Sequence, residues 1–448
     1  MVPAGEPIIS VGVLTDKKIH FELYGDFKVF GFKNSFSGIF NTEVKDDVII
    51  CTGPATKLEI TDEVIFEPQD PLSESFVLRD VVIGIDFHWE RREKQRFNHS
   101  LKLVRDGNNV VAINLIPLEH YLFSVISSEM NPKSSLQLLK AQAVISRSWI
   151  IVQLEKSKTQ SGKDAYKSEY ESGEEYIRWY GREEHGLYDV CADDHCQRFQ
   201  GVAKMAGDKA REAVIQTRGV VILSDNKICD TRYSKSCGGI TEGFENVWEP
   251  VKFPCLSSVI DYKYEPENYN FNFSDETNVR KWILSSPPAF CNTGDKKILS
   301  QILTEYDQGT TDFFRWKIEY SQEELSAIIK EKSGKDFGKI LDLIPVERGS
   351  SARLIKLKIV GTEKTLIIGK ELEIRRILSH THLYSSAIVI DKELGKAKVP
   401  EKFIIHGAGW GHGVGLCQIG AAVMAERGHQ FDEILLHYFS NASIKKIY

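Results

Sequence analysis

Residues 99–130 read HSLKLVRDGNNVVAINLIPLEHYLFSVISSEM, and the spacing of their apolar residues changes part-way along. Before Pro117 the apolar residues alternate with polar ones, which is typical of β-strands. After Pro117 they recur every three or four positions, which is typical of a helix with one buried face. Pro117 can open this helix, because its missing N–H is one that the first helical turn would not use. The stretch therefore predicts strands that run directly into a helix.

The same two patterns extend outward from this stretch. The first 80 residues consist of short alternating runs such as IISVGVL and KIHFELYG, separated by Gly and Asp, and we interpret them as antiparallel strands. A second helix is expected to begin near Ser134 or Ser135, either of which can cap it. Further strands are expected at 199–223, 228–233, 354–360 and 364–368, and further helices at 321–333, after Gln418 and from Phe431.

These elements predict an α+β protein in which mixed and antiparallel sheets and helices surround a central substrate groove. We expect an N-terminal β-rich region at 1–80, the first part of a core at 81–260, an inserted auxiliary lobe at 261–345 and the second part of the core at 346–448. A polar and highly charged stretch at about 152–187 predicts a surface insertion in the first part of the core.

Composition excludes several classes of protein. The chain has 448 residues, of which 42% are hydrophobic and 27% charged, as in ordinary globular proteins, which argues against a disordered or fibrous chain. A formal net charge of −6 provides no overall basic excess for binding nucleic acid, so we expect no such partner. Eight Cys residues are too sparse for a disulfide scaffold, so each Cys cluster has to be judged on its spacing.

Two segments bear on membranes and export. Residues 403–425 carry no formal charge over a length that could cross a bilayer, but Gly at every second position from Gly407 to Gly415 indicates a loop. We therefore expect no transmembrane segment in this chain. The N-terminal residues lack the basic and apolar regions of a signal peptide, so the protein is cytoplasmic or the numbering begins after a removed signal.

Glu129 is the first candidate for a catalytic group. Five apolar residues mark one face of the helix that follows Pro117, namely Leu118, Tyr121, Leu122, Val125 and Ile126. Glu129 continues that face at the helix end, where loss of hydration would favour the protonated carboxyl and suit it to act as a general acid. The alternative is that the helix emerges into solvent at its last turn. On the next helix, Lys140, Gln142 and Arg147 are candidate substrate-binding residues, although such residues are more often solvated.

Cys191, His195 and Cys196 form the second candidate site, within the segment CADDHC. Two thiols and an imidazole so close together are suited to bind zinc, with one coordination position left for water or another side chain. A disulfide between Cys191 and Cys196, or two unconnected thiols, would explain the same spacing.

Two glycine-rich segments complete the candidates. Residues 233–241 (YSKSCGGIT) describe a strand that runs into a glycine turn, which lets the backbone approach a ligand. Residues 407–421 (GAGWGHGVGLCQIGA) place a bare backbone beside Trp410 and His412 before a helix that begins near Gln418. This second segment lacks the lysine and hydroxyl of a phosphate-binding loop, so we interpret it as the wall of another kind of site.

Taken in order, these segments resemble the SpoIID/LytB family of bacterial cell-wall proteins. The resemblance is carried by IPLEHYLFSVISSEMNPKSSLQLLKAQAVISRSW, VCADDHCQRFQG, RYSKSCGGITEGFENVW and GWGHGVGLCQIGAAVMAERGHQFDEILLHYF, and more weakly by VERGSSARLIKLKIVG at 346–361. It spans roughly 111–260 and 401–448. The tracts at 152–187 and about 262–345 are poorly covered.

The resemblance implies a role for each candidate residue. Family members that cut the wall are lytic transglycosylases whose catalytic acid falls on Glu129, although this chain reads E-M-N-P with one extra residue before the Pro. Some members hold zinc at a segment that matches Cys191, His195 and Cys196. Two further family motifs match the following residues: Tyr233, Ser236, Gly238, Gly239, Thr241, His412 and Gln418. We expect these residues to bind substrate together with Trp410, which lies within the second glycine-rich segment.

The resemblance also implies a function and a location. We expect cleavage of the MurNAc–GlcNAc β-1,4 bond of glycan strands that lack stem peptides, with Glu129 as the acid, 1,6-anhydroMurNAc ends as products and one zinc per chain. The alternative from another class is a non-catalytic, wall-binding enhancer of a cell-wall amidase, and a zinc hydrolase is a third hypothesis. Family proteins act outside the cytoplasmic membrane, so we expect a signal sequence to have been removed.

Overall fold

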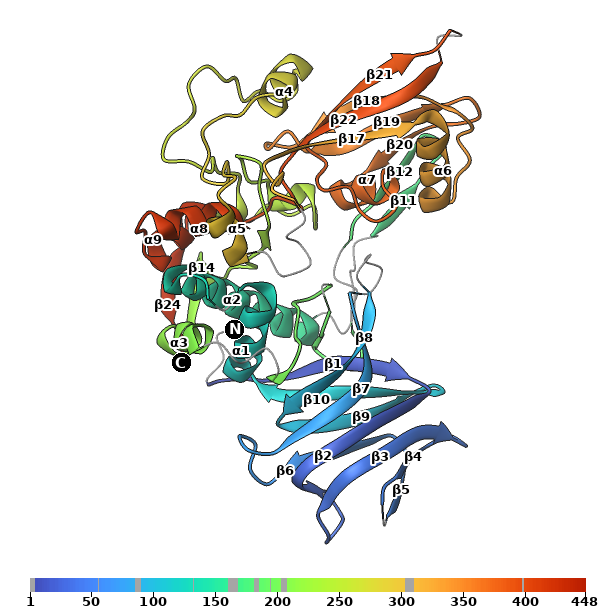
Figure 1. Cartoon of the computed structure of the whole chain (residues 1–448), viewed down its shortest axis with the longest axis vertical. Coiled ribbons are helices and arrows are strands. Elements are labelled where there is room, and N and C mark those ends of the chain that lie inside the picture. Colours follow the sequence, from blue (N-terminus) through green and yellow to red (C-terminus); the bar gives the residue numbers. More distant parts are fainter. Residues whose placement is uncertain are drawn as a thin grey trace. The chain divides into compact units, whose positions relative to one another are not determined.

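The computed structural model of the protein (Figure 1) describes residues 5–54, 56–84, 90–131, 133–159, 168–180, 185–193, 195–202, 208–302, 310–396 and 399–448. Its helices and its mixed and antiparallel sheets confirm the predicted α+β class. The chain forms two compact units. Unit 1 contains Met1–Thr159, Glu184–Val221 and Lys445–Tyr448, and unit 2 contains Gln160–Glu183 and Ile222–Ile444. The four-part division of the sequence stays a prediction.

Unit 1 is built on a large β-sheet, shown in blue and cyan in Figure 1. Its strands are β1 (Ile8–Asp16), β2 (Lys18–Val29), β3 (Phe36–Lys45), β4 (Val48–Thr52), β5 (Lys57–Ile60), β6 (Glu63–Pro68), β7 (Ser75–Ile83), β8 (Arg91–Asn98), β9 (Ser100–Asp106), β10 (Asn109–Pro117) and β13 (Val190–Cys191). Their order among the described residues is β13-β1-β10-β9-β6-β2-β3-β4-β5, and β7 pairs with both β2 and β8. Apart from the parallel pair of β1 and β13, these strands pair antiparallel, as the alternating pattern predicted.

Three helices of unit 1 pack against one another, and the first of them contacts β10 and β1. They are α1 (Leu118–Glu129), α2 (Leu136–Thr159) and α3 (Asp208–Gln216). The hydroxyl of Ser135 accepts a hydrogen bond from the N–H of Leu138 (3.2 Å), so this serine caps α2 as predicted. The strand predicted at 199–223 is wrong over α3, because Ala210, Ala213 and Val214 lie on one buried helical face.

Two larger sheets lie in unit 2, besides the short pair of β16 and β23 described below. The first is mixed and has the order β11-β12-β20-β19-β18, with β11 (Glu169–Glu171), β12 (Glu175–Arg178), β18 (Ile340–Arg348), β19 (Leu354–Gly361) and β20 (Thr365–Gly369). The second is antiparallel and has the order β17-β22-β21, with β17 (Arg315–Ser321), β21 (Ile388–Leu394) and β22 (Pro400–Ala408). The predicted strands at 354–360 and 364–368 are confirmed as β19 and β20.

Helices and short elements complete unit 2. The helices are α4 (Glu276–Ile283), α5 (Lys296–Ile302), α6 (Gln322–Ser333), α7 (Glu371–Ile377), α8 (Gln418–Glu426) and α9 (Phe431–Tyr438). The short elements are η2 (Phe244–Asn246), η3 (Pro254–Leu256), β16 (Tyr233–Ser234) and β23 (Leu416–Cys417). The predicted helix at 321–333 is confirmed as α6, which Ser321 caps at its start and Gly334 ends in a left-handed conformation. Two strands span positions at which the chain passes from one unit to the other. They are β14 (Val220–Ser224) and β24 (Ser443–Lys446), and β14 also pairs with β15 (Lys227–Ile228).

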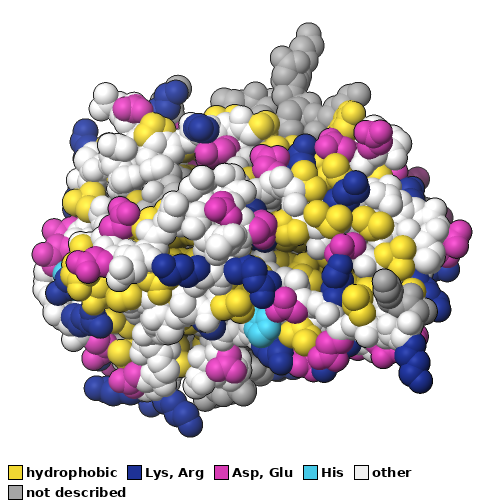
Figure 2. Space-filling model, turned by 90° about the horizontal axis from the view of Figure 1, so that it is seen from above, with side chains coloured by type: hydrophobic (Ala, Val, Ile, Leu, Met, Phe, Trp, Pro, Cys, Tyr) yellow, Lys and Arg dark blue, Asp and Glu magenta, His cyan; other side chains and the backbone are white. Residues whose placement is uncertain are grey.

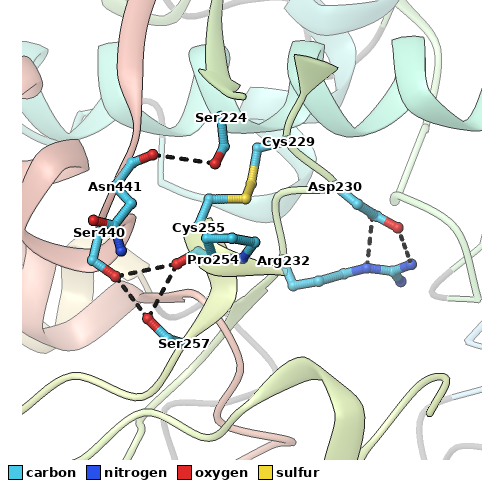
Figure 3. The surroundings of a disulfide bond; sticks show 9 residues. All are labelled: Ser224, Cys229, Asp230, Arg232, Pro254, Cys255, Ser257, Ser440 and Asn441. Atoms are coloured by element: carbon cyan, nitrogen blue, oxygen red, sulfur yellow. Dashed lines mark hydrogen bonds and ion pairs between the residues drawn. A yellow bond between two sulfur atoms is a disulfide. The ribbon is translucent and has the colours of Figure 1, made fainter. Parts of the chain in front are cut away.

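A disulfide that the sequence did not predict joins Cys229 to Cys255 in unit 2 (Figure 3). It ties the segment before β16 to η3, and Arg232 nearby forms an ion pair with Asp230 (3.0 Å). The hydroxyls of Ser257 and Ser440, 2.7 Å apart, add a second link close to this bond.

Two earlier expectations concern the surface charge and membrane-spanning segments. Acidic and basic side chains are interspersed on the face shown in Figure 2, as expected from the small net charge. Among the described helices, none is both long and apolar enough to span a bilayer. The charge-free stretch at 403–425 folds as part of β22, a loop, β23 and α8. Within the predicted insertion at 152–187, residues 160–167 and 181–184 lie outside the described residues, as does Pro132 of the E-M-N-P motif.

Candidate active site and metal centre

Glu129 is the last residue of α1 and is half-buried there. The five apolar residues that predicted its position are fully buried, namely Leu118, Tyr121, Leu122, Val125 and Ile126. Glu129 therefore continues the buried face of the helix, but at a point where its carboxylate can still be reached from outside. A carboxyl group that donates a proton to a ligand needs this access.

The segment that follows Cys191, His195 and Cys196 (the Cys–His cluster) holds the carboxylate of Glu129. Its Oε1 accepts a hydrogen bond from the backbone N–H of Arg198 (2.9 Å). The preceding residue, Gln197, is buried and accepts a hydrogen bond through Oε1 from the hydroxyl of Tyr121 on α1 (3.3 Å). Residues 197 and 198 thus connect α1 directly to Cys196.

The structure brings Cys191, His195 and Cys196 together and adds His185, which the sequence analysis missed. The Sγ of Cys196 lies 3.4 Å from Nε2 of His185 and 3.5 Å from Nδ1 of His195, and the Sγ of Cys191 lies 3.9 Å from that Nδ1. All four donor atoms lie within 4.8 Å of one another. In the part of the chain that the structure describes, Cys191 and Cys196 form no disulfide.

The four donors fit a tetrahedral zinc ion. Zinc bonds of about 2.3 Å to sulfur and 2.0–2.1 Å to nitrogen place neighbouring sulfur and nitrogen ligands about 3.6 Å apart in a tetrahedron. The observed separations of 3.4, 3.5 and 3.9 Å lie close to this value. The cluster can therefore hold a metal without large movements of its side chains.

Local packing explains why His185 reaches the cluster. Cys191 ends β13, which pairs with β1 so that Cys191 lies opposite Gly12. A Cβ atom at Gly12 would lie 2.5 Å from the ring of Tyr188, so only glycine leaves room for that ring. Tyr188 in turn stacks on His185, with ring centroids 4.7 Å apart. The spacing H-x5-C-x3-H-C was the available signal in the sequence.

Electrostatics at the cluster favour the metal-binding form of a thiol. Hydrogen bonding from Cys196 lowers the pKa of Cys191, hydrogen bonds from His185 and His195 act in the same direction, and burial opposes them. A cavity of about 210 Å³ lies beside the cluster and is lined by Cys191 and Tyr188 together with residues of β1 and β7. Glu129 does not line this cavity.

The predicted substrate-binding residues of α2 differ in exposure. Lys140 is half-buried, whereas Gln142 and Arg147 are fully buried. Nε and Nη2 of Arg147 donate to the two carboxylate oxygens of Glu119 (2.9 and 2.7 Å). Glu119 was not among the candidates from the sequence. Burial would raise the pKa of Glu119, but Arg147 and the hydroxyl of Tyr448 outweigh it and lower that pKa. This geometry favours a positioning role for Arg147 between α1 and α2.

The two glycine-rich segments form one structure in unit 2. Strand β16 pairs in parallel with β23, so that Tyr233 faces Leu416. Ser236 and Trp410 exchange backbone hydrogen bonds of 3.0 and 2.7 Å. Gly238 has a φ of +80°, and a Cβ atom there would lie 2.8 Å from the backbone nitrogen of Gly409. Glycine is therefore required where the two segments touch.

Side chains of this joint structure are partly exposed and partly buried. Tyr233, Trp410 and His412 are half-buried, whereas Ser236, Gly238, Gly239, Thr241 and Gln418 are buried. Trp410 stacks on Tyr384 with ring centroids 3.8 Å apart. Among the described residues, the hydroxyl of Ser236 and Nε2 of Gln418 have no hydrogen-bond partner. Buried polar atoms of this kind are rare and are expected to meet water or a ligand.

His412 is held as a neutral imidazole. Its Nδ1 accepts a hydrogen bond from the N–H of Val414 (3.0 Å), and its ring packs edge-on against Trp248. Burial, together with the charges of Arg232, Arg375 and Arg353, lowers the pKa of His412 well below its usual range. At neutral pH the imidazole therefore offers hydrogen bonding and no positive charge.

Comparison with known proteins finds matches to two family models. Residues 106–223 match the family described as Stage II sporulation protein, and residues 242–415 match a domain of unknown function (DUF8618). Stage II sporulation protein D of Bacillus amyloliquefaciens is 24% identical over 349 residues, covering 78% of this chain and 79% of that protein. These matches support the SpoIID/LytB family for this chain.

Two other relatives cover different shares of this chain. The amidase enhancer of Bacillus subtilis is 24% identical over 245 residues, which cover 52% of this chain and 32% of the enhancer. An uncharacterized protein of Brachyspira hyodysenteriae is 23% identical over 449 residues, which cover 98% of this chain and 94% of that protein. Glu129 and the Cys–His cluster lie in unit 1, and the glycine-rich motifs lie in unit 2. That both sets of SpoIID/LytB motifs line one groove stays a prediction.

Proposed function

We propose that the protein is a lytic transglycosylase that cleaves the MurNAc–GlcNAc β-1,4 bond of denuded peptidoglycan strands. The observation that carries this proposal is the position of Glu129, half-buried at the end of α1 and held by the N–H of Arg198. An oriented carboxyl group of this kind can deliver a proton to a bound glycosidic oxygen. The relatives named for sporulation protein D and an amidase enhancer support a function in the cell wall.

In the proposed reaction, Glu129 protonates the oxygen that leaves with GlcNAc. The C6 hydroxyl of the same MurNAc attacks C1, and its proton passes to the carboxylate that Glu129 has become. No water is consumed, and the product carries a 1,6-anhydro ring. A single carboxyl group can serve as both acid and base here, whereas hydrolysis by glycosidases usually requires two carboxyl groups.

Cys191, His195, Cys196 and His185 would hold one zinc ion in this proposal. Bound zinc would supply structural cross-linking of the four side chains, and a set of four protein ligands leaves no position open for a reactive water. Residues 197 and 198 follow directly, so ordering Cys196 also orders the N–H group that holds Glu129. In this proposal the sugar would be bound by Lys140 and by residues of the two glycine-rich segments, namely Tyr233, Ser236, Gly238, Gly239, Thr241, Trp410, His412 and Gln418.

The proposed substrate places the protein outside the cytoplasmic membrane, with glycan strands as its partner. The test incubates the full chain with denuded strands and weighs the products. We expect anhydro-MurNAc ends, each lighter by one water than a hydrolysis product, and we expect Glu129→Gln to abolish them. Glu212→Gln changes an exposed carboxylate on α3 of the same unit and is the matched control. Reducing MurNAc ends, or an active Glu129→Gln protein with an intact fold, would refute the assignment.

The second candidate function is that of a non-catalytic enhancer of a cell-wall amidase. The likeness to the Bacillus subtilis amidase enhancer over 52% of this chain favours it. An enhancer would bind glycan strands and raise the rate of an added amidase without releasing anhydro ends. The Glu129→Gln protein would then enhance the amidase as well as the unaltered chain does.

A further inference from the structure

A second cluster of thiols lies inside unit 2, apart from the Cys–His cluster. Cys237, Asp261, Cys291 and Cys417 are all buried, and one ligand atom from each lies within 4.8 Å of the others. Cys237 belongs to the turn after β16 and Cys417 ends β23, whereas Asp261 and Cys291 lie on either side of α4. Residues that are far apart in the sequence therefore converge on one point.

The spacing of the sulfur atoms suits a shared ion. The Sγ atoms of Cys237 and Cys291 are 3.7 Å apart. Two thiolates bound to zinc at about 2.3 Å in a tetrahedron lie about 3.8 Å apart, whereas a disulfide requires about 2.05 Å. The Sγ of Cys417 accepts a hydrogen bond from the backbone N–H of Cys237 (3.2 Å), so the lone pairs of this sulfur are already oriented within the cluster.

The carboxyl group of Asp261 is oriented in the way that a metal ligand is. Its Oδ1 accepts a hydrogen bond from the hydroxyl of Tyr438 (2.6 Å), and its Oδ2 accepts one from the N–H of Cys291 (2.8 Å). A Cβ atom at Gly420 would overlap both the Tyr438 hydroxyl and Oδ1 of Asp261, so glycine makes room for this arrangement. Hydrogen bonds that fix a ligating carboxylate are typical of metal sites.

In the described part of the chain, the carboxyl group of Asp261 is hydrogen-bonded to neutral donors. No basic side chain in the described ranges forms an ion pair with Asp261, although this residue is fully buried. Arg315 is the guanidinium whose charge acts on the nearby thiols, but its hydrogen bonds go to the backbone oxygens of Gly238, Trp282, Ser285 and Phe314. A bound cation would compensate the charge that this buried carboxyl group carries when it is ionised.

We propose that Cys237, Asp261, Cys291 and Cys417 bind a structural zinc ion, independent of the ion proposed at Cys191. Three soft thiolates and one carboxylate form a closed set of four protein ligands, which is typical of structural zinc. The ion fastens the turn at 236–241 to the start of α8. It is therefore a positioning element for Ser236 and Gln418, whose unpartnered polar atoms lie next to Cys237 and Cys417 in the chain.

The test measures zinc in the full chain purified without chelator. We expect two zinc ions per chain, one after Cys191→Ser/Cys196→Ser, and one after Cys237→Ser/Cys291→Ser. Cys51→Ser, at a buried lone thiol of unit 1, is the matched control and should retain two. Because the two double variants are measured separately, loss of either site leaves the other result interpretable.

Two measurements keep the proposal testable if the second double variant does not fold. Asp261→Asn keeps the shape of the side chain and should lower the affinity of one of the two ions at least tenfold in a chelator competition. In the unaltered chain, the cobalt-substituted protein should show thiolate charge-transfer absorption that is only partly lost in Cys191→Ser/Cys196→Ser. A zinc-free protein after Cys191→Ser/Cys196→Ser, or mass analysis showing Cys237 bonded to Cys291, would overturn the proposal.

Discussion

Replacing Arg147 by Met tests whether this residue holds unit 1 together or contacts substrate. The side chains of Arg147 and Glu119 are 0% and 4% exposed, and two hydrogen bonds of 2.9 and 2.7 Å join them. Met retains most of the volume of the arginine stem and removes the charge. Among the described residues, the buried carboxylate of Glu119 would then keep the hydroxyl of Tyr448 and the N–H of Gly219 as partners.

The expected loss is large because one partner of a buried ion pair is removed. Breaking such a pair costs about 3–5 kcal/mol, since the remaining charge is left without compensation. Arg218→Met is the matched control in the same unit. Its side chain is 50% exposed and pairs with Glu6, and exposed pairs contribute only about 0–1 kcal/mol.

The pH dependence of this loss has a definite sign. In the unaltered chain the folded-state pKa of Glu119 lies below the unfolded value of 4.5, so the pair stabilises the fold above pH 4.5 and loses its effect as the pH falls through the folded pKa. In the Arg147→Met protein, burial acts without the guanidinium and raises the pKa of Glu119. The variant should therefore recover stability relative to the unaltered chain as the pH is lowered.

Hydrogen exchange measured by mass spectrometry on peptides of α1 and α2 is the appropriate assay, because two units need not unfold in one transition. Removing both charges with Glu119→Gln/Arg147→Met should restore much of the opening free energy. A loss in Arg147→Met no larger than that in Arg218→Met, combined with loss of glycan binding, would refute the positioning role and favour direct contact with substrate.

Three further predictions concern the metal cluster and unit 2. His185→Ala should lower zinc affinity at the Cys–His cluster by at least tenfold in a chelator competition, and unchanged affinity would remove His185 from the ligand set. Gly420→Ala should cost about 1–3 kcal/mol in urea unfolding, because its Cβ overlaps the hydroxyl of Tyr438 and the carboxyl of Asp261; a neutral substitution would show that the contact yields. His412→Ala should weaken glycan binding with little change in melting temperature. Glycan binding by the unaltered chain should not vary between about pH 6 and 8, because the imidazole of His412 is already neutral there. A strong dependence on pH in that range would contradict this.

The parts of the fold that depend on neighbouring residues could be predicted from the sequence. The buried face of α1 and the cap of α2 follow from spacings of three or four residues, and both are confirmed. The strand predicted over α3 was wrong because the helix buries only a short face of small residues, Ala210, Ala213 and Val214, in a polar segment. Three small apolar residues give only a weak periodic signal, whether for a helix or for a strand.

The parts of the site that depend on distant residues were harder to predict. Cys191, His195 and Cys196 are close in sequence, so their spacing alone indicated a cluster. His185 joins them only because the ring of Tyr188 packs against Gly12 of another strand. Cys237 and Cys417 were each visible within a glycine-rich motif, but nothing local indicated that the two motifs pair or that Asp261 and Cys291 meet them. Such convergence is a property of the tertiary fold.

The contact between Tyr448 and Glu119 has a consequence for the order of events during biosynthesis. These residues share unit 1 and a hydrogen bond of 2.7 Å, although 329 positions separate them in the chain. At roughly 5–20 residues per second, a ribosome adds Tyr448 roughly 15 to 65 s after Glu119. Throughout that interval the nascent N-terminal sheet and its helices lack one of the groups that satisfy the buried carboxylate. We therefore expect unit 1 to reach its final stability only after translation of unit 2, so that a ribosome stalled within unit 2 would carry an N-terminal half that is open to proteases and chaperones.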